Sequence, residues 1–283
     1  MPTDALPAEL REGLRDHALD ALGTRAIAAS VSGFTPSRLS KSDILDALAE
    51  GRVGVAYQPI VHAGTHALHH HECLIRVRDP AGAPLPAGDV VGAAETHGLV
   101  HRLDRRALRL ASRAMIARPG LRLALNVSAQ TVCDPRASAD YLDALVLMGR
   151  AAARLTLELT ETVAVADPVR AARFSARARE MGCGFAIDDF GTGFTSFRNL
   201  LAIEADSLKI DGGFVDDLAT SERSRSFVRM MVEMADTFGM TTVAERVETP
   251  EIARELAACG VDYLQGYLFG RPGPLAEELR RSA

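Results

Sequence analysis

The sequence lacks any apolar run that approaches the ~20 residues needed to cross a bilayer. Its N-terminus also lacks the basic and then apolar pattern of a secretory signal peptide. These two absences argue against a membrane-spanning or conventionally secreted chain. We therefore expect a soluble protein of the cytoplasm.

Cysteine is scarce and scattered. The four cysteines, Cys73, Cys133, Cys183 and Cys259, form no Cys-x-x-Cys pair. This pattern indicates buried apolar side chains in a reducing compartment.

The sequence also lacks an excess of basic charge. Its formal net charge is −5, which argues against a protein that grips long nucleic acid through a broad basic face. A small phosphorylated ligand held by metal ions remains compatible with this charge. Arginine-rich helices are expected at 102–113 and 170–179, but acids lie nearby, and we interpret both as solvated outer faces.

Apolar residues make up 47% of the chain, which is enough for a sizeable core. Residues 1–40 show helical spacing and then turn signals, and they are too few for an independent domain. We interpret 1–40 as a helical lead-in or linker and 41–283 as the main domain. A capping pattern at Ser40 and Asp43 predicts that a helix begins there.

Short β-like runs alternate with longer amphipathic helices from residue 53 onward. The expected strands are 53–60, 68–77, 121–127, 154–159, 184–187, 207–210, 241–244 and 261–264. The expected helices are 87–97, 101–117, 137–151, 168–181, 222–238 and 250–258. This alternation predicts βαβ units in an α/β fold, and the strand number favours a closed, TIM-like (β/α)8 barrel over an open sheet.

Nearly every expected strand carries a polar residue at or near its C-terminal end. These residues are Glu72, Asn126, Glu158, Asp188, Asp189, Lys209, Glu245 and Gln265. Because a barrel gathers the C-terminal ends of its strands into one mouth, the pattern predicts a catalytic site there. The histidines at 69–71 precede Glu72, and we interpret them as ordinary strand or rim residues because strand side chains alternate between faces.

The adjacent acids Asp188 and Asp189 end the apolar segment 184–187 and precede a glycine-punctuated loop. Adjacent carboxylates repel each other, and a divalent cation is the simplest counter-charge. Hard oxygen ligands suit Mg²⁺ or Mn²⁺. The plain alternative is a solvated Asp-Asp turn, but the other acids favour a cation.

The set of oxygen donors is large for a single ion. Glu72, Asn126, Glu158, Asp188 and Asp189 fit two ions that share a bridging aspartate, an arrangement suited to in-line displacement at a phosphodiester. Glu245 is a candidate metal ligand or base, and the sequence leaves both roles open. Lys209 is a candidate to neutralise phosphate oxygens or to orient the attacking water.

Eight segments then resemble the EAL family of bacterial cyclic di-GMP phosphodiesterases, in fixed order over roughly residues 41–274. They are Tyr57-Gln-Pro-Ile60, Glu72-Cys-Leu-Ile-Arg76, Leu125-Asn-Val-Ser128, Leu157-Glu-Leu-Thr-Glu161, Asp188-Asp-Phe-Gly-Thr-Gly193, Leu208-Lys-Ile-Asp211, Ala244-Glu-Arg-Val-Glu-Thr249 and Gln265-Gly-Tyr-Leu-Phe-Gly-Arg-Pro272. The resemblance implies a TIM-like barrel with one antiparallel strand and hydrolysis of cyclic di-GMP to linear pGpG. It also implies two Mg²⁺ or Mn²⁺ ions.

The resemblance also implies roles for individual residues. By position, the resemblance implies that the ligands of the first ion are Glu72, Asn126, Glu158 and Asp188, and that those of the second are Asp188, Asp189 and Glu245. It implies that the catalytic residues are Glu245, Lys209 and Asp189, and that the residues in contact with the nucleotide are Gln58, Arg76 and Asp211. Supporting positions are Glu161, Glu248 and Gln265.

The chain departs from the family pattern at a few positions. The signature Glu-Ala-Leu reads Glu72-Cys73-Leu74, a mild change, but Arg246 replaces a glycine directly after Glu245. Arg246 keeps open an alternative, a catalytically impaired module that binds cyclic di-GMP or a protein partner. The resemblance also predicts a homodimer through 222–238, where Met230, Met231 and Met234 form a stripe; the plain alternative is that this stripe faces the barrel.

Overall fold

The computed structural model describes residues 39–160, 167–190 and 204–275, and everything below concerns these residues. The chain divides into two units, Met1–Arg38 and Leu39–Ala283. The predicted lead-in lies almost wholly outside the described residues, so that prediction stays a prediction. The described part opens with helix α2 (Lys41–Ala49), where Ser40 and Asp43 form the expected capping box.

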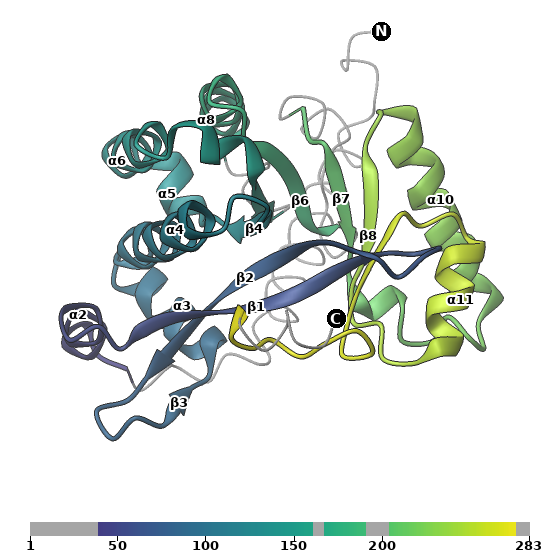
Figure 1. Ribbon diagram of the computed structural model, residues 1–283, viewed down its shortest axis with the longest axis horizontal. Helices are drawn as coiled ribbons and strands as arrows, with labels where there is room; N and C mark the ends of the chain where they lie inside the picture. Colours follow the sequence, from purple (N-terminus) through teal and green to yellow (C-terminus); the bar gives the residue numbers. More distant parts are fainter. Residues whose placement is uncertain (1–38, 161–166, 191–203, 276–283) are drawn as a thin grey trace, which may run out of the picture. The chain divides into compact units, whose positions relative to one another are not determined.

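The strands form one sheet that closes on itself (Figure 1). They are β1 (Val53–His62), β2 (Leu68–Arg78), β3 (Pro84–Leu85), β4 (Leu123–Asn126), β5 (Leu155–Thr160), β6 (Gly184–Phe190), β7 (Ser207–Ile210), β8 (Thr241–Ala244) and β9 (Tyr263–Gln265). The order is β1-β9-β8-β7-β6-β5-β4-β2-β3, and a further β1–β2 pairing closes a ring of eight strands that leaves β3 outside.

Strand β1 is antiparallel to both of its neighbours in the ring, β2 and β9, whereas the remaining ring strands pair in parallel. The TIM-like barrel with one antiparallel strand is therefore confirmed. Because β1 and β2 form a hairpin, no crossover helix is needed between them.

Helices cover the outside of the barrel (Figure 1). They are α3 (Ala87–Thr96), α4 (Val100–Ala117), α5 (Ala129–Cys133), α6 (Pro135–Val146), α8 (Pro168–Glu180), α10 (Glu222–Thr237) and α11 (Pro250–Ala258), with 3-10 turns η2 (Gly149–Arg154) and η3 (Gly212–Phe214). The main core lies between these helices and the strands, and includes Phe174, Phe185 and Leu157. A second apolar cluster, including Ile44 and Leu103, seats α2 against α3 and α4.

Two predicted elements are wrong in their limits for identifiable reasons. The helix expected over 137–151 ends at Val146, because Gly149 has a φ of +54° and the chain continues as the separate turn η2. The strand expected to end at Ile187 continues to Phe190, so that both acids of the Asp188–Asp189 pair lie within β6.

Candidate active site

A single ammonium group lies at the centre of the barrel mouth. Lys209 comes from the interior of β7 and its side chain is 1% exposed. Four carboxylate oxygens surround its Nζ: Glu245 Oε1 at 2.7 Å, Asp188 Oδ1 at 2.9 Å, Glu158 Oε2 at 3.2 Å and Glu72 Oε2 at 3.6 Å. Residues from β2, β5, β6, β7 and the end of β8 thus meet at one point, as the strand-end pattern predicted.

The amide side chains predicted for the site hold Glu72 in place. Asn126 Nδ2 donates to Glu72 Oε1 at 2.7 Å, and Gln265 Nε2 donates to Glu72 Oε2 at 2.6 Å. Gln265 Nε2 also lies 3.2 Å from Gln58 Oε1, and Gln58 Nε2 donates to the carbonyl of Gly270. Gln58 is therefore part of the wall of the site, in reach of a ligand at its mouth.

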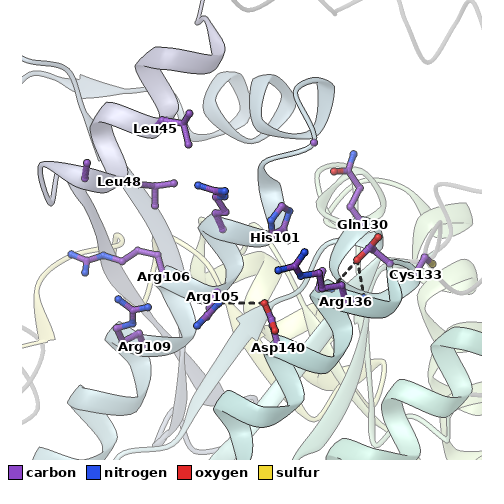
Figure 2. A pocket seen from close by; sticks show the side chains of 15 residues that line it. Leu45, Leu48, His101, Arg105, Arg106, Arg109, Gln130, Cys133, Arg136 and Asp140 are labelled. Atoms are coloured by element: carbon purple, nitrogen blue, oxygen red, sulfur yellow. Dashed lines mark hydrogen bonds and ion pairs between the residues drawn. The ribbon is translucent and has the colours of Figure 1, made fainter.

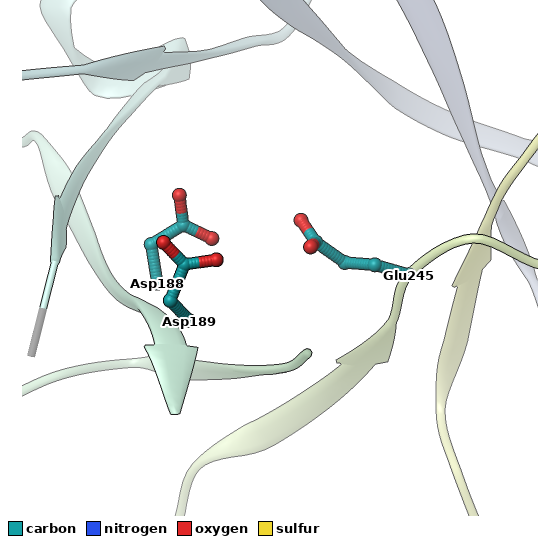
Figure 3. Close-up of side chains that lie close together, drawn as sticks. All are labelled: Asp188, Asp189 and Glu245. Carbon is teal, nitrogen blue, oxygen red and sulfur yellow. The ribbon is translucent and has the colours of Figure 1, made fainter. Parts of the chain in front are cut away.

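Asp188, Asp189 and Glu245 form a second group, in which one oxygen of each lies within 4.8 Å of the others (Figure 3). Consecutive strand residues normally point to opposite faces. Here three steps along β6, from Ile187 to Phe190, pair with two steps along β7, so β6 contains a bulge. Asp189 takes a φ of +55° within this bulge, a conformation that aspartate tolerates better than most residues. The bulge turns both carboxylates toward Glu245.

The negative charge of the mouth exceeds what one lysine balances. Five acids, Glu72, Glu158, Asp188, Asp189 and Glu245, face one ammonium. Burial, together with the charges of Asp188 and Glu72, raises the pKa of Glu245 to about 7 against the opposing effect of Lys209. Burial likewise raises the pKa of Glu158 well above its ordinary value. These carboxylates therefore favour an additional cation.

The pKa shifts of Lys209 and Glu72 both favour the charged form. Burial opposes the charged form of Lys209, but the carboxylates of Glu158 and Glu72 outweigh it and raise the pKa of the ammonium well above its ordinary value. Burial would also raise the pKa of Glu72, yet Lys209 and the donated hydrogen bonds lower it overall.

The donor set fits a divalent cation. Asp188 Oδ1 lies near Lys209 but has no hydrogen bond, and Gln265 Oε1 is buried without a donor. The three-carboxylate group around Asp189 and the absence of sulfur from it match the oxygen chemistry of Mg²⁺ or Mn²⁺. Glu158 and Asn126 lie at paired positions of β5 and β4, next to Glu72.

Other predicted residues lie farther from this centre. Arg76 lies on β2 four residues beyond Glu72 and donates to the carbonyl of Ile75. Asp211 caps the turn η3 by accepting from the Gly213 amide. Glu248 is exposed and lines a cavity of about 350 Å³ at the mouth, together with Gln58, Glu72, Glu245 and Gln265. Glu161 lies outside the described residues.

Arg246 also lines this mouth cavity. Its φ of +57° is the left-handed conformation that glycine adopts freely, which is compatible with the glycine that the family pattern has here. The side chain turns outward, crosses the face of Gly212 and pairs with Asp216 at 3.0 Å. The carbon atoms of Arg246 fill the space that a side chain at residue 212 would need, which explains the glycine there.

Gly266 is a supporting residue that the sequence reasoning missed. A Cβ at Gly266 would overlap the backbone of Val247, and the Val247 amide donates to the Gln265 carbonyl at 3.0 Å. This close approach fixes the segment after Glu245 against the end of β9. The signal was present in the sequence as the glycine that follows Gln265.

The fold and the mouth together define a barrel with an acidic, metal-competent centre at the C-terminal ends of its strands. Residues 41–272 match the EAL domain family, and the chain belongs to it. It is 34% identical over 249 residues to the cyclic di-GMP phosphodiesterase NbdA of Pseudomonas aeruginosa, covering 86% of this chain and 32% of NbdA. It is 32% identical over 240 residues to the cyclic di-GMP phosphodiesterase RocR of the same organism, covering 83% of this chain and 61% of RocR.

Solved structures agree with these sequence matches. The PaMucR phosphodiesterase in complex with c-di-GMP has a TM-score of 0.77 and 31% identity, over 83% of this chain and 98% of that chain. The FimX EAL domain of Xanthomonas citri in complex with c-diGMP has a TM-score of 0.74 and 26% identity, over 83% of this chain and 93% of that chain. The chain spans about a third of the length of NbdA. No helix within the described ranges is long and apolar enough to span a membrane.

Proposed function

We propose that this chain hydrolyses cyclic di-GMP to linear pGpG. The observation that carries the proposal is the mouth itself, where four carboxylates surround the buried ammonium of Lys209 and three carboxylates gather within 4.8 Å. The family match and the phosphodiesterases among the relatives support the same substrate.

Two Mg²⁺ or Mn²⁺ ions fit the oxygen donors of the mouth. One would be held by Glu72, Asn126, Glu158 and Asp188, and the other by Asp188, Asp189 and Glu245. When bound, such ions polarise the phosphodiester and make water more acidic. Their two-site arrangement is part of the proposal, since among the described residues only the group of Asp188, Asp189 and Glu245 has its oxygens already close together.

The side chains of the mouth have distinct tasks in this reaction. Lys209 holds a permanent positive charge 2.7 Å from Glu245 Oε1 and 2.9 Å from Asp188 Oδ1, where it can stabilise charge that develops on phosphate oxygens and orient water. Glu245, with its raised pKa, is either a ligand or the group that accepts the proton of that water. Gln58 and Gln265 present amide groups to the nucleotide from the cavity wall.

Turnover of cyclic di-GMP by the purified protein tests the proposal. The appearance of pGpG is followed by chromatography with Mg²⁺ and then Mn²⁺, alongside Glu245→Gln and, as a control, the exposed Glu251→Gln on α11. We expect hydrolysis by the wild type and by Glu251→Gln, and a loss of about 10²–10⁴-fold in Glu245→Gln. Absence of both turnover and binding would overturn the proposal.

A second candidate function is a receptor that binds cyclic di-GMP without hydrolysing it. Arg246 favours it, because it follows Glu245 directly, lines the mouth cavity and holds a left-handed backbone angle in place of glycine. Calorimetric binding of cyclic di-GMP without turnover would favour the receptor.

Two further parts of the proposal concern assembly and location. We propose a homodimer through α10, on which Met230 is 53% exposed and Phe227 is also exposed. The methionines of the predicted stripe differ in exposure, because Met231 is 2% exposed and faces the core whereas Met230 is exposed. Light scattering at micromolar concentration, with Met230→Lys as the disrupting variant, tests the dimer; a wild-type monomer would contradict it.

A cytoplasmic location stays a prediction from the sequence.

A further inference from the structure

A large groove lies on the outside of the barrel, away from the mouth. Its volume is about 1160 Å³, and it is bordered by α2 on one side, α4 along its length, and α5 and α6 on the other (Figure 2). The α2 side contributes Leu45, Leu48 and Ala49, which are apolar and only partly buried or exposed. The remaining walls contain His101 and are rich in arginine: Arg102, Arg105, Arg106, Arg109 and Arg136.

Four of these arginines repel one another along one face of α4. Arg102, Arg105, Arg106 and Arg109 stand at positions i, i+3, i+4 and i+7, so each has like-charged neighbours three or four residues away. Such pairs destabilise a helix. The one acid of α4, Asp104, points away and accepts hydrogen bonds from Ser128 and Thr131 instead. The helix therefore carries a concentration of charge that it does not neutralise itself.

The neighbouring elements neutralise little of this charge. Asp140 of α6 lies 3.4 Å from Arg105, with both side chains about half exposed, and Asp134 caps the start of α6. Arg106 donates to the carbonyl of Val53. Within the described parts of the chain, Arg102, Arg109 and Arg136 have no acidic partner. A protein with a net charge of −5 thus concentrates unpaired positive charge in one groove.

We propose that this groove docks an acidic amphipathic helix of a partner protein. The cations of α4 span about 10 Å at helical spacing, so a second helix can present acids at the same spacing to them. The leucines on the α2 side offer apolar contact to the adjoining face of that helix, as in the binding of an amphipathic helix in a groove. A nucleic acid would gain little from an apolar wall, whereas an acidic helix uses both walls. This binding is separate from catalysis at the mouth.

The probe for this surface is a fluorescent synthetic helical peptide with glutamates at i, i+3, i+4 and i+7 and leucines on the adjoining face. Its binding to the full chain is measured by fluorescence anisotropy at low and high salt. We expect saturable binding that weakens with salt and falls at least about tenfold in Arg102→Glu/Arg109→Glu. Leu45→Ser/Leu48→Ser should weaken it as well, which charge alone would not explain.

The matched control is Arg113→Glu, which changes an exposed arginine of the same helix outside the groove. It should leave peptide affinity within about twofold of the wild type, because Arg113 does not line the groove and its exposed charge is weakened by water and salt. All variants should keep wild-type circular dichroism and turnover. The proposal is overturned if no binding occurs, if a scrambled peptide of the same composition binds equally well, or if Arg113→Glu weakens binding as much as the groove variants. Equal affinity for an RNA oligonucleotide of the same charge would also overturn it.

Discussion

The mouth of the barrel and the groove along α4 both concentrate charge of one sign, but in opposite environments. At the mouth, acids surround Lys209, whose side chain is 1% exposed. In the groove, arginines such as Arg102 and Arg109 are exposed to solvent. Charges interact strongly where water is excluded and weakly where water and salt screen them.

This difference shows which charges determine the fold and which remain available for a partner. At the mouth, removing one charged side chain leaves others buried and unpaired, so the effect on stability and activity is large. In the groove, the same kind of change alters little until a partner excludes the water. We therefore expect the effects of substitutions to decrease from the buried centre outward.

The largest effect is expected for Lys209→Met. This change leaves Glu72, Glu158, Asp188 and Glu245 without their shared cation, and should destabilise the metal-free protein by about 3–5 kcal/mol. Turnover should fall by at least about 10²-fold because a group that stabilises developing charge is lost. Urea unfolding in EDTA and the chromatographic assay measure the two effects.

The control for this prediction is Lys41→Met, which removes an exposed lysine at the start of α2. It should change the free energy of unfolding by less than about 0.5 kcal/mol. Equal stabilities of Lys209→Met and the wild type in EDTA would contradict the importance of burial at the mouth.

A second large effect is expected for Gly266→Ala. The added methyl group overlaps the backbone of Val247, so the segment that carries Glu245 must move. A displacement of about 1 Å can cost on the order of 10²-fold in rate, and we expect a loss of this size. The matched control is Gly120→Ala, since a Cβ there has no atom within 4 Å and φ is not positive. Similar kcat values for the two variants would disprove this role for Gly266.

Much of the mouth could be predicted from the sequence because its residues follow a simple rule. Parallel strands of a closed barrel place their C-terminal ends together, and so Asn126, Glu158 and Lys209 were expected at one centre. The antiparallel direction of β1 came only from the family resemblance, because alternation of strands and helices does not reveal the direction of a strand. The observed hairpin between β1 and β2 agrees with the family resemblance and does not conflict with the alternation of strands and helices.

Other features depend on neighbours that are distant in the sequence. The left-handed backbone of Asp189 results from the bulge where β6 pairs with β7, and no local pattern indicates it. The groove illustrates the same limit. The arginines at 102–113 were interpreted as a solvated face, and all of them except the partly buried Arg106 are exposed. Only the fold places Leu45 and Arg136 beside them.

The mouth should also show a characteristic pH dependence. Glu245 has a folded pKa of about 7, raised from 4.5, so the folded metal-free protein retains a proton that the unfolded chain releases earlier. Its stabilising contribution is complete at low pH and is lost as pH rises from about 4.5 through about 7, by on the order of 2–4 kcal/mol. Metal binding requires the carboxylate, so it restores stability most at high pH.

Thermal melts with EDTA or Mn²⁺ at about pH 5.5 and about pH 8 measure this dependence. The increase in Tm on adding metal should be larger at the higher pH, and Glu245→Gln should reduce that difference while the exposed Glu251→Gln leaves it intact. A metal-induced shift that is the same at both pH values would argue against Glu245 as a ligand.

The smallest effect is expected at Arg246, which lies between the two environments. Its left-handed backbone costs about 1 kcal/mol for any residue other than glycine, whereas its pair with Asp216 joins side chains that are 59% and 47% exposed and contributes little. Arg246→Gly should therefore stabilise the protein by up to about 1 kcal/mol, and Asp216→Asn should change stability by less than about 0.5 kcal/mol. An increase in turnover in Arg246→Gly would show that the arginine obstructs the mouth. If Arg246→Gly instead weakens the binding of cyclic di-GMP while Asp216→Asn does not, Arg246 contacts the nucleotide and is as important for function as the buried charges. Unchanged turnover and binding would make the arginine a surface residue that the mouth tolerates because Gly212 leaves room for its side chain.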